Sequence, residues 1–344
     1  MKVGLAYDPI FLEHDTGPHP ENASRLTHAL GLLEVSGVRE QLVDIPVQKA
    51  SLEQLSLVHS AEHIKRVDEM AARGGGWLDA DTVVSPASYD VALHAAGALL
   101  SATESVIAGD LDSAFALVRP PGHHAMQSHS MGFCLFNNLA VAAREATVTH
   151  GVERVLIVDF DVHHGNGTQD TFYHDPSVLY FSTHQFPFYP GTGSLHETGA
   201  GGAKGTTLNV PLPAWCGDED YLQVFQEILV PAARRFRPDL VLVSAGYDAH
   251  WADRISLMQL SVPTYAQFAR VLRELAEELS HGRLVFTLEG GYHLEAQAYS
   301  IKAMIEVLLD GKSCDDPLGR SPERKGPAGV QQLIGEIKEI HNLA

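Results

Sequence analysis

The stretch VLIVDFDVHHGNGTQD, residues 155–170, joins an apolar run to a dense group of ionisable side chains. The run ends in Asp159, and Asp161, His163 and His164 follow at once. A short run of Val, Leu and Ile is typical of a strand that is buried on both faces. The stretch therefore predicts a buried strand that carries functional side chains at its carboxyl end.

Outward from this stretch, short apolar runs alternate with longer helical patterns along the chain. The predicted strands are 3–7, 113–118, 154–160, 177–182, 206–212, 239–246 and 283–290. The predicted helices are 22–35, 86–108, 137–150, 219–236, 263–281, 294–310 and 329–342. Such alternation predicts an α/β fold in which a mostly parallel sheet is covered by helices on both faces. No linker interrupts it before residue 311, so we expect one domain over 1–344, with the polar segment 311–328 and the last helix appended.

Five predicted strands deliver polar residues at or just past their carboxyl ends. The segments are Arg119–His124, Asp159–His163, Ser182–His184, Tyr247–His250 and Tyr292 after its two glycines. In open parallel sheets, ligands bind at that edge. We therefore expect these segments to converge on one site.

Composition limits the classes of function. The 344 residues are 45% hydrophobic, with a formal net charge of -19, which argues against binding a nucleic-acid backbone and is compatible with a cationic substrate. Three cysteines far apart suggest neither a disulfide framework nor a cysteine zinc site. The first residues lack the apolar region of a signal peptide, and we expect no apolar run near the ~20 residues that span a bilayer. These features predict a cytoplasmic protein that does not bind membranes.

The Asp-rich stretch has the side chains of a metal site. Asp161 and His163 are two apart, so on an extended segment they point to the same side, and Asp248 can join them from a neighbouring strand. Carboxylate oxygen and imidazole nitrogen suit Zn²⁺ or Fe²⁺, and three protein ligands leave a position open for catalysis. The alternative is that the two aspartates cap the helices after their strands, with His163 packed nearby.

Two further segments offer proton chemistry beside such a metal. His123 and His124 are candidates for general acid and base, because imidazole titrates near the working pH. Tyr292 could donate a hydrogen bond to a developing oxyanion. The alternatives are an incidental histidine doublet and a packed aromatic side chain.

Seven segments, taken together, resemble the zinc-dependent histone deacetylase family, which includes bacterial histone-deacetylase-like amidohydrolases and acetylpolyamine amidohydrolases. They are HPENASRL, RPPGHHA, GFCLFNN, VDFDVHHGNGTQD, YPGTG, SAGYDAH and LEGGY, in the family's order over residues 19 to 292. The resemblance implies the arginase-like three-layer fold, with an eight-stranded parallel sheet.

The resemblance also implies roles for individual residues. Asp161, His163 and Asp248 match the zinc ligands. His124 matches the general base and acid, His123 with Asp159 the electrostatic partner, and Tyr292 the oxyanion donor. Other matches are the channel walls at Gly132, Phe133 and Tyr189, the internal-cavity arginine at Arg25, a potassium site at Asp159, Asp161, His163, Ser182 and Thr183, a second monovalent site near Phe172, Asp175, Val178 and Thr206, and His164 as a residue that does not bind zinc.

Two positions depart from parts of the family. Asn166 replaces the Asp that class I members place behind the second histidine, so the chain looks class II-like, and His124 should lose its proton more easily. Ile255 occupies the rim position where polyamine-selective eukaryotic members carry Glu, so it offers no charge to a distant ammonium.

The resulting expectation is a zinc-dependent deacetylase that hydrolyses N-acetyl-lysine in peptides or proteins. Three alternatives remain: an acetylpolyamine amidohydrolase, an arginase-type di-manganese ureohydrolase, and a non-catalytic protein that binds an acyl ligand. A homo-oligomer is compatible with the sequence.

Overall fold

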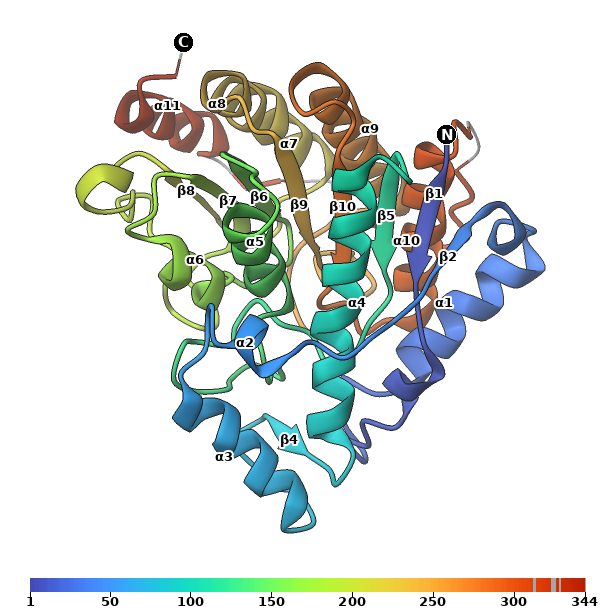
Figure 1. Cartoon of the computed structure of the whole chain (residues 1–344). Coiled ribbons are helices and arrows are strands. Elements are labelled where there is room, and N and C mark those ends of the chain that lie inside the picture. The colour runs from blue at the N-terminus through green and yellow to red at the C-terminus, as the bar shows by residue number, and fades with distance from the viewer. Residues whose placement is uncertain (312–313, 323–325, 328, 344) are drawn as a thin grey trace.

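The computed structural model describes residues 1–311, 314–322, 326–327 and 329–343, and an eight-stranded parallel sheet forms its centre (Figure 1). The strand order is β2-β1-β5-β10-β9-β6-β7-β8. The strands are β1 (Val3–Ala6), β2 (Val43–Ile45), β5 (Ser113–Ala116), β6 (Val155–Asp159), β7 (Val178–Gln185), β8 (Thr207–Leu212), β9 (Leu240–Ala245) and β10 (Leu284–Leu288). The predicted fold class is confirmed.

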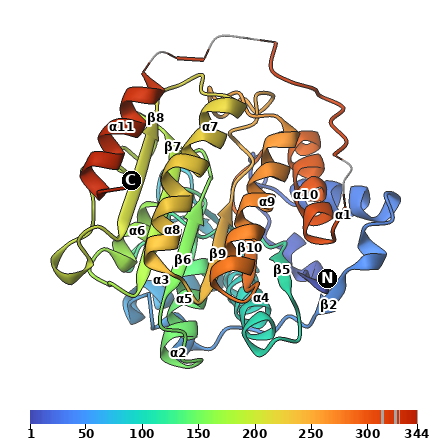
Figure 2. The ribbon, with the colours of Figure 1, turned by 90° about the horizontal axis from the view of Figure 1, so that it is seen from above.

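Helices cover both faces of the sheet, as parallel strands require. α4 (Ser88–Ala108) and α5 (Asn138–Val148) pack together on one face, in front of the sheet in Figure 1. α8, α9 and α10 lie side by side on the other face, as Figure 2 shows, and α1 packs against α10. Their bounds are α1 Ser24–Val35, α7 Asp218–Val224, α8 Val230–Phe236, α9 Val262–Leu279, α10 Leu294–Leu308 and α11 Val330–His341.

Smaller elements lie in the connections, chiefly beyond the carboxyl edge of the sheet. They are α2 (Leu52–Leu55), α3 (Ala61–Ala72), α6 (Asn166–Phe172), the antiparallel pair β3 (Gly76–Trp77) and β4 (Val83–Val84), and 3-10 turns at Pro9–Leu12, Arg39–Gln41 and Gly201–Ala203. The Ser60 side chain caps α3 by accepting a hydrogen bond from the His63 amide. None of these short elements was predicted from the sequence.

The strand register places a polar row at the carboxyl edge. Asp159, the last residue of β6, is aligned with Ser182 of β7 and Ser244 of β9. All three are fully buried, whereas the positions before them in each strand are apolar core residues. The sheet therefore changes from hydrophobic core to polar site within one residue.

Three details of the predicted elements need correction: a strand end, a helix interruption and a missing strand. β7 continues through Gln185, because its last residues still pair with β8, so Ser182 and Thr183 lie inside the strand and not beyond it. The predicted helix 219–236 is divided by a π-helical turn at Phe225–Leu229. The eighth strand, β2, was missed because it has only three residues and two of them are exposed.

Helix α4 corrects the expectation about membrane-length segments. Its 21 residues are long and apolar enough to cross a bilayer by length and composition. In the fold, 67% of its apolar window is buried against the sheet and α5, which is the environment of a core helix. In the appended part of the chain, residues 312–313, 323–325 and 328 lie outside the described residues, while α11 packs against β8.

Candidate active site

Three predicted metal ligands meet at the carboxyl edge of the sheet. Ligand atoms of Asp161, His163 and Asp248 lie within 4.8 Å of one another, and all three residues are buried. His163 Nδ1 is 3.0 Å from Asp161 Oδ1 and 3.1 Å from Asp248 Oδ2. Neither aspartate caps a helix, because Gly165 is the N-cap of α6 and Ser261 is the N-cap of α9. The structure therefore excludes the capping alternative.

The charges at this cluster favour a bound cation. Burial and repulsion from Asp161 raise the pKa of Asp248 to about 6. Burial opposes a charge on His163, but its contacts with the two carboxylates outweigh burial and raise its pKa to about 10. Two buried carboxylates that face one point repel each other, and a divalent cation between them would remove that repulsion.

The hydrogen bonds leave one ligand oxygen unused. Asp161 Oδ2 accepts from the Gly290 amide at 2.7 Å, and Asp248 Oδ1 accepts from the Val162 amide at 3.0 Å. Asp248 Oδ2 is buried and accepts no hydrogen bond from the residues that the structure describes, although it lies 3.1 Å from His163 Nδ1. A buried carboxylate oxygen without a donor is costly, so this atom fits a metal ligand. The donor set of two oxygens and one nitrogen fits zinc.

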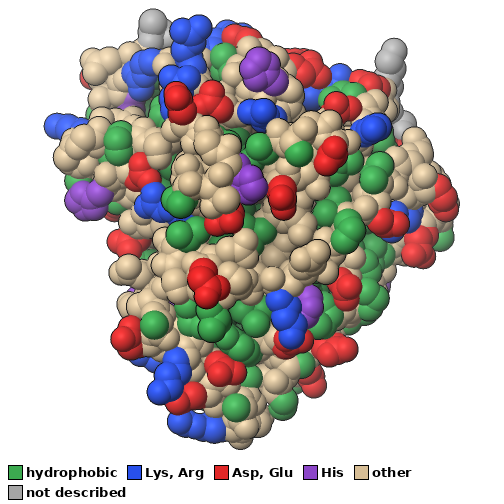
Figure 3. Space-filling model, viewed as in Figure 1, with side chains coloured by type: hydrophobic (Ala, Val, Ile, Leu, Met, Phe, Trp, Pro, Cys, Tyr) green, Lys and Arg blue, Asp and Glu red, His purple; other side chains and the backbone are tan. Residues whose placement is uncertain are grey.

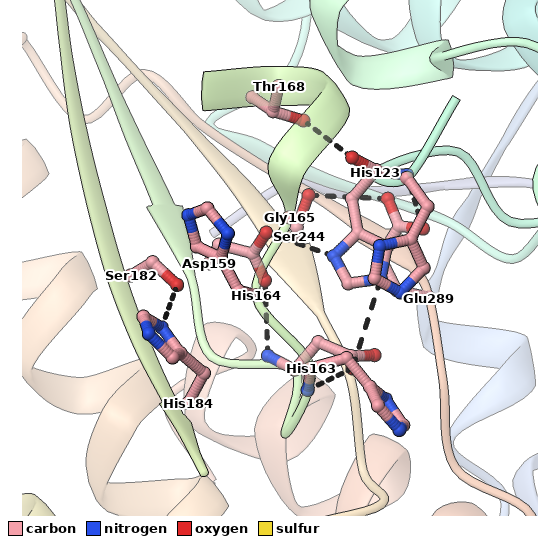
Figure 4. A network of polar contacts seen from close by, with 12 residues as sticks. His123, Asp159, His163, His164, Gly165, Thr168, Ser182, His184, Ser244 and Glu289 are labelled. Atoms are coloured by element: carbon pink, nitrogen blue, oxygen red, sulfur yellow. Dashed lines mark hydrogen bonds and ion pairs between the residues drawn. The ribbon is translucent and has the colours of Figure 1, made fainter. Parts of the chain in front are cut away.

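The histidine doublet lies beside the cluster, with each ring held by a different partner. His123 Nδ1 is 3.0 Å from Asp159 Oδ2 (Figure 4), and the same oxygen also accepts from the Tyr180 hydroxyl. His124 Nδ1 is 2.7 Å from the side-chain oxygen of Asn166. Both Nδ1 atoms face acceptors, so each carries a proton, and Nε2 of His124 is left as the basic atom when that ring is neutral.

The two partners give the rings different charges. Burial opposes a charge on His123, but Asp159 and Asp161 outweigh it and raise its pKa to about 10. Burial, together with repulsion from His123 and His163, holds the pKa of His124 well below its usual range. The surroundings therefore favour the charged form of His123 and the neutral form of His124.

A buried carboxylate that sequence reasoning missed supports the doublet. Glu289 Oε2 accepts hydrogen bonds from the amides of Gly122 and His123, and Ser244 donates to Oε1 (Figure 4). The signal that could have identified it is its position directly after β10, inside the LEGGY segment. These bonds fix the backbone that carries both histidines.

A cavity of about 260 Å³ leads to the cluster. The predicted channel residues Gly132, Phe133, Tyr189 and Ile255 all line it, together with both histidines of the doublet and Tyr292. Phe188 was missed: its ring stacks on His163 at 5.3 Å between centroids. Tyr189 meets His124 edge-on at 5.2 Å.

Gly132 has to be glycine at this wall. Its φ is +55°, and a Cβ built there would lie 2.8 Å from His124 Cγ. A side chain at 132 would displace the imidazole, since real Cβ atoms do not approach a ring so closely.

Tyr292 is held in place at its backbone by Asp253 and at its ring by Arg25. Asp253 Oδ2 accepts from the backbone amides of Tyr292 and His293 at 2.6 and 2.9 Å. The Arg25 guanidinium lies 4.9 Å from the Tyr292 ring centroid and also bonds to the Gly291 carbonyl. Burial raises the pKa of Tyr292 well above its usual range, so the phenol keeps its proton and remains a donor.

The rim carries a charge that was not predicted. Asp81, from the loop between β3 and β4, lines the same cavity as Ile255. Burial and repulsion from Asp79 raise its pKa. Ile255 adds no charge to this cavity, as expected from its side chain, but Asp81 brings a carboxylate into the same lining.

The monovalent-cation residues are distributed more widely. Ser182 and Thr183 are buried in β7. Ser182 Oγ bonds to His184 Nδ1 (Figure 4), and Thr183 Oγ1 has no hydrogen-bond partner among the described residues. His164 turns to Thr192 and Gln169, away from the metal cluster, as its predicted role requires. At the second site, the Asp175 carboxylate pairs with Arg144. A cation at either place stays a prediction.

Comparison with known proteins decides the family. A model of the histone deacetylase domain matches residues 19–308. The chain belongs to the histone deacetylase family. It is similar to the structure titled "Crystal Structure of HDA15 HD domain", with a TM-score of 0.91 and 35% identity over 99% of this chain and 94% of the other.

Members of this family from several kingdoms are similar to the chain. The relative named histone deacetylase 10, chloroplastic, of Oryza sativa subsp. japonica is 42% identical, covering 96% of this chain and 79% of the relative. A probable deacetylase of Archaeoglobus fulgidus is 38% identical, over 99% and 98%. A histone deacetylase-like amidohydrolase of Pseudomonas aeruginosa is 39% identical, over 92% and 89%. The protein is a hydrolase with deacetylase or amidohydrolase activity.

Proposed function

We propose that this histone deacetylase family member hydrolyses the amide of N-acetyl-lysine in peptides or proteins, with one zinc ion per chain. The observation that carries the proposal is the convergence of Asp161, His163 and Asp248 at the floor of the cavity that the histidine doublet and Tyr292 line. When bound there, zinc supplies a Lewis acid that polarises the amide carbonyl and lowers the pKa of water.

The two histidines divide the proton chemistry. His124, neutral and held through Nδ1 by Asn166, offers Nε2 to take the proton of the attacking water. The Met126 and Met131 sulfurs lie 3.1 and 3.3 Å from the Asn166 amide nitrogen, which leaves its oxygen for His124. The same Nε2 then returns the proton to the leaving amine. His123, charged beside Asp159, stabilises the negative charge that develops nearby.

Tyr292 supplies the remaining donor. No described residue accepts a hydrogen bond from its hydroxyl, so that group is free to bind the oxyanion. The aromatic walls Phe133, Phe188 and Tyr189 fit an unbranched alkyl stem and exclude water around it. The products are acetate and a free amine.

Acetylpolyamine hydrolysis is the second candidate, and Asp81 favours it. A carboxylate at the rim can bind a distant ammonium, and acidic side chains are also spread over the visible surface (Figure 3). Ile255 argues the other way, because it adds no charge at that edge of the cavity. The catalytic groups argue against a purely binding role, and the three-residue ligand set argues against a two-metal ureohydrolase.

The deciding measurement is the ratio of kcat/KM for acetyl-lysine peptides and for N-acetylputrescine at fixed ionic strength. We expect the peptides to be preferred and Ile255→Glu to shift the ratio toward the polyamine. If the unmodified enzyme prefers N-acetylputrescine to every peptide, the polyamine activity replaces the proposed one. A structural potassium ion, a cytoplasmic location, no contact with nucleic acid or membrane and a homo-oligomer remain further proposals.

A further inference from the structure

An exposed cation lies next to the cavity. Arg254 directly precedes Ile255, which lines the cavity, and follows Asp253, which holds the Tyr292 backbone. Arg254 is exposed, and within the described part of the chain no carboxylate forms an ion pair with it. In a chain with a formal net charge of -19, an unpaired arginine beside a substrate cavity is unexpected.

Arg254 lines a second hollow, of about 330 Å³, which we call the flanking hollow. Its apolar members are Trp215, Trp251, Leu257, Met258 and Pro322. Trp215 and Leu257 are unusually open for such side chains, at 41% and 47% exposure. The flanking hollow thus combines exposed apolar surface with one free positive charge, as recognition sites often do.

The carboxylate that also lines the flanking hollow, Asp253, already accepts hydrogen bonds from the backbone. Asp253 is buried, and its oxygens accept from the amides of Ile255, Tyr292 and His293. Both Asp253 oxygens are thus occupied by backbone amides, while the guanidinium of Arg254 stays available to a bound peptide.

One ordered loop separates the flanking hollow from the catalytic cavity. Ser256 Oγ donates to the carbonyl of Asp248, and the Leu257 amide donates to Gln185 at 2.9 Å. The loop is thereby tied to a metal-cluster residue and to the end of β7. Ile255 lines the catalytic cavity and its neighbours Arg254 and Ser256 line the flanking hollow, so a peptide with its acyl-lysine in the cavity can continue across this loop.

We propose that the flanking hollow binds the peptide segment next to the acyl-lysine and selects segments with a carboxylate beside an apolar side chain. This inference rests on the proposed peptide deacetylation. Arginine binds carboxylate through two parallel hydrogen bonds, and the tryptophan and leucine surfaces bury the neighbouring apolar group. The same cation repels the ammonium groups of a polyamine, and so opposes the attraction of Asp81.

The test uses acetyl-lysine peptides of equal length that carry Glu, Gln or Lys next to a leucine, on the amino or the carboxyl side. The enzymes are the unmodified protein, Arg254→Gln and Arg270→Gln. Arg270 is exposed on α9 and lines neither hollow, so its variant removes the same charge elsewhere. We expect kcat/KM to favour Glu over Gln by roughly two- to fivefold on one side, as for an exposed ion pair, and to fall with added salt.

The preference should disappear in Arg254→Gln and persist in Arg270→Gln. If the Gln peptide is hydrolysed as fast as the Glu peptide by the unmodified enzyme, the flanking hollow does not select carboxylates, although peptide deacetylation still holds. If both variants lose the preference equally, the general field of the protein is responsible and the inference is wrong. If no peptide is hydrolysed, the proposed function fails as well.

Discussion

The Nδ1 atom of His124 lies 2.7 Å from the amide oxygen of Asn166, whereas its neighbour His123 faces a carboxylate. An amide oxygen accepts the ring proton without supplying a full negative charge. It orients the imidazole and leaves its pKa low, so the surroundings favour a neutral His124 beside a charged His123.

Replacing that amide by a carboxylate should move the pH dependence of catalysis. In Asn166→Asp, the new charge stabilises the imidazolium, so the pKa of His124 rises. Because His124 must be neutral to accept a proton, the acidic limb of the kcat/KM profile should shift to higher pH. The control is Gln331→Glu, which adds the same charge on an exposed position of α11. An unshifted limb would show that His124 is not the base that this limb reports.

Metal content should depend on three residues and not on their neighbour. Asp161→Ala, His163→Ala and Asp248→Ala each remove one of three ligands, so the purified variants should lose zinc. His164→Ala is the matched control and should retain one ion per chain, because its ring bonds to Thr192 and Gln169. Elemental analysis measures this directly. A variant that keeps full zinc removes its residue from the ligand set.

The Tyr292 hydroxyl should matter for turnover alone. Tyr292→Phe removes one oxyanion donor, which typically lowers kcat by about 10²–10³-fold. Zinc content and thermal stability should be unchanged, since Asp253 holds the backbone of residue 292 and not its hydroxyl. Tyr189→Phe, in the same cavity, should have a much smaller effect. Near-normal turnover of Tyr292→Phe on an unactivated acetyl-lysine peptide would exclude the proposed role.

Stability should depend on the protonation of Glu21. Burial alone would raise its pKa, but Arg119, at 2.5 and 2.7 Å, and Arg25 outweigh burial and lower the pKa to about 2. A carboxyl with a depressed pKa stabilises the fold fully above its unfolded pKa, near 4.5, and that contribution, roughly 3 kcal/mol, is lost as the pH falls toward 2.

Glu21→Gln tests this linkage by chemical denaturation of metal-free protein between neutral and acidic pH. The variant should be destabilised by about 3–5 kcal/mol at pH 7, because two arginines stay buried without their partner. The difference from the unmodified protein should narrow in acid. Glu278→Gln, which breaks the exposed pair with Arg234, should change little. A constant difference at every pH would mean that Glu21 does not titrate as stated.

The sequence predicted the centre of the sheet because its strands are continuous apolar runs that end in polar residues. β2 could not be found in this way, since a three-residue edge strand with two exposed positions has no such pattern. The end of β7 was misplaced for a related reason: Ser182 and Thr183 are polar, yet their backbones still pair with β8. Polar side chains near the end of a strand therefore indicate where the candidate site begins, but they do not show where the backbone hydrogen bonds of the strand end.

The sequence was enough to predict those parts of the site whose residues lie close together along the chain. Asp161 and His163 share one segment, and the two histidines share another. Phe188 and Asp81 could not be assigned in advance, because an aromatic side chain that forms a channel wall looks like core and a carboxylate on a short loop looks solvated. Only the three-dimensional path of the chain brings each of them to the cavity.

Gly290 has no side chain that could take part in catalysis, yet a substitution at this position would disturb the site. A Cβ at that position would lie 2.6 Å from Asp161 Oδ2 and 2.9 Å from Asp248 Cγ. Even alanine would push both carboxylates apart while leaving every ligand and every catalytic group in the sequence intact. Inspection of the reactive residues alone would therefore count such a chain as active, although the two carboxylates would no longer be placed for the proposed metal.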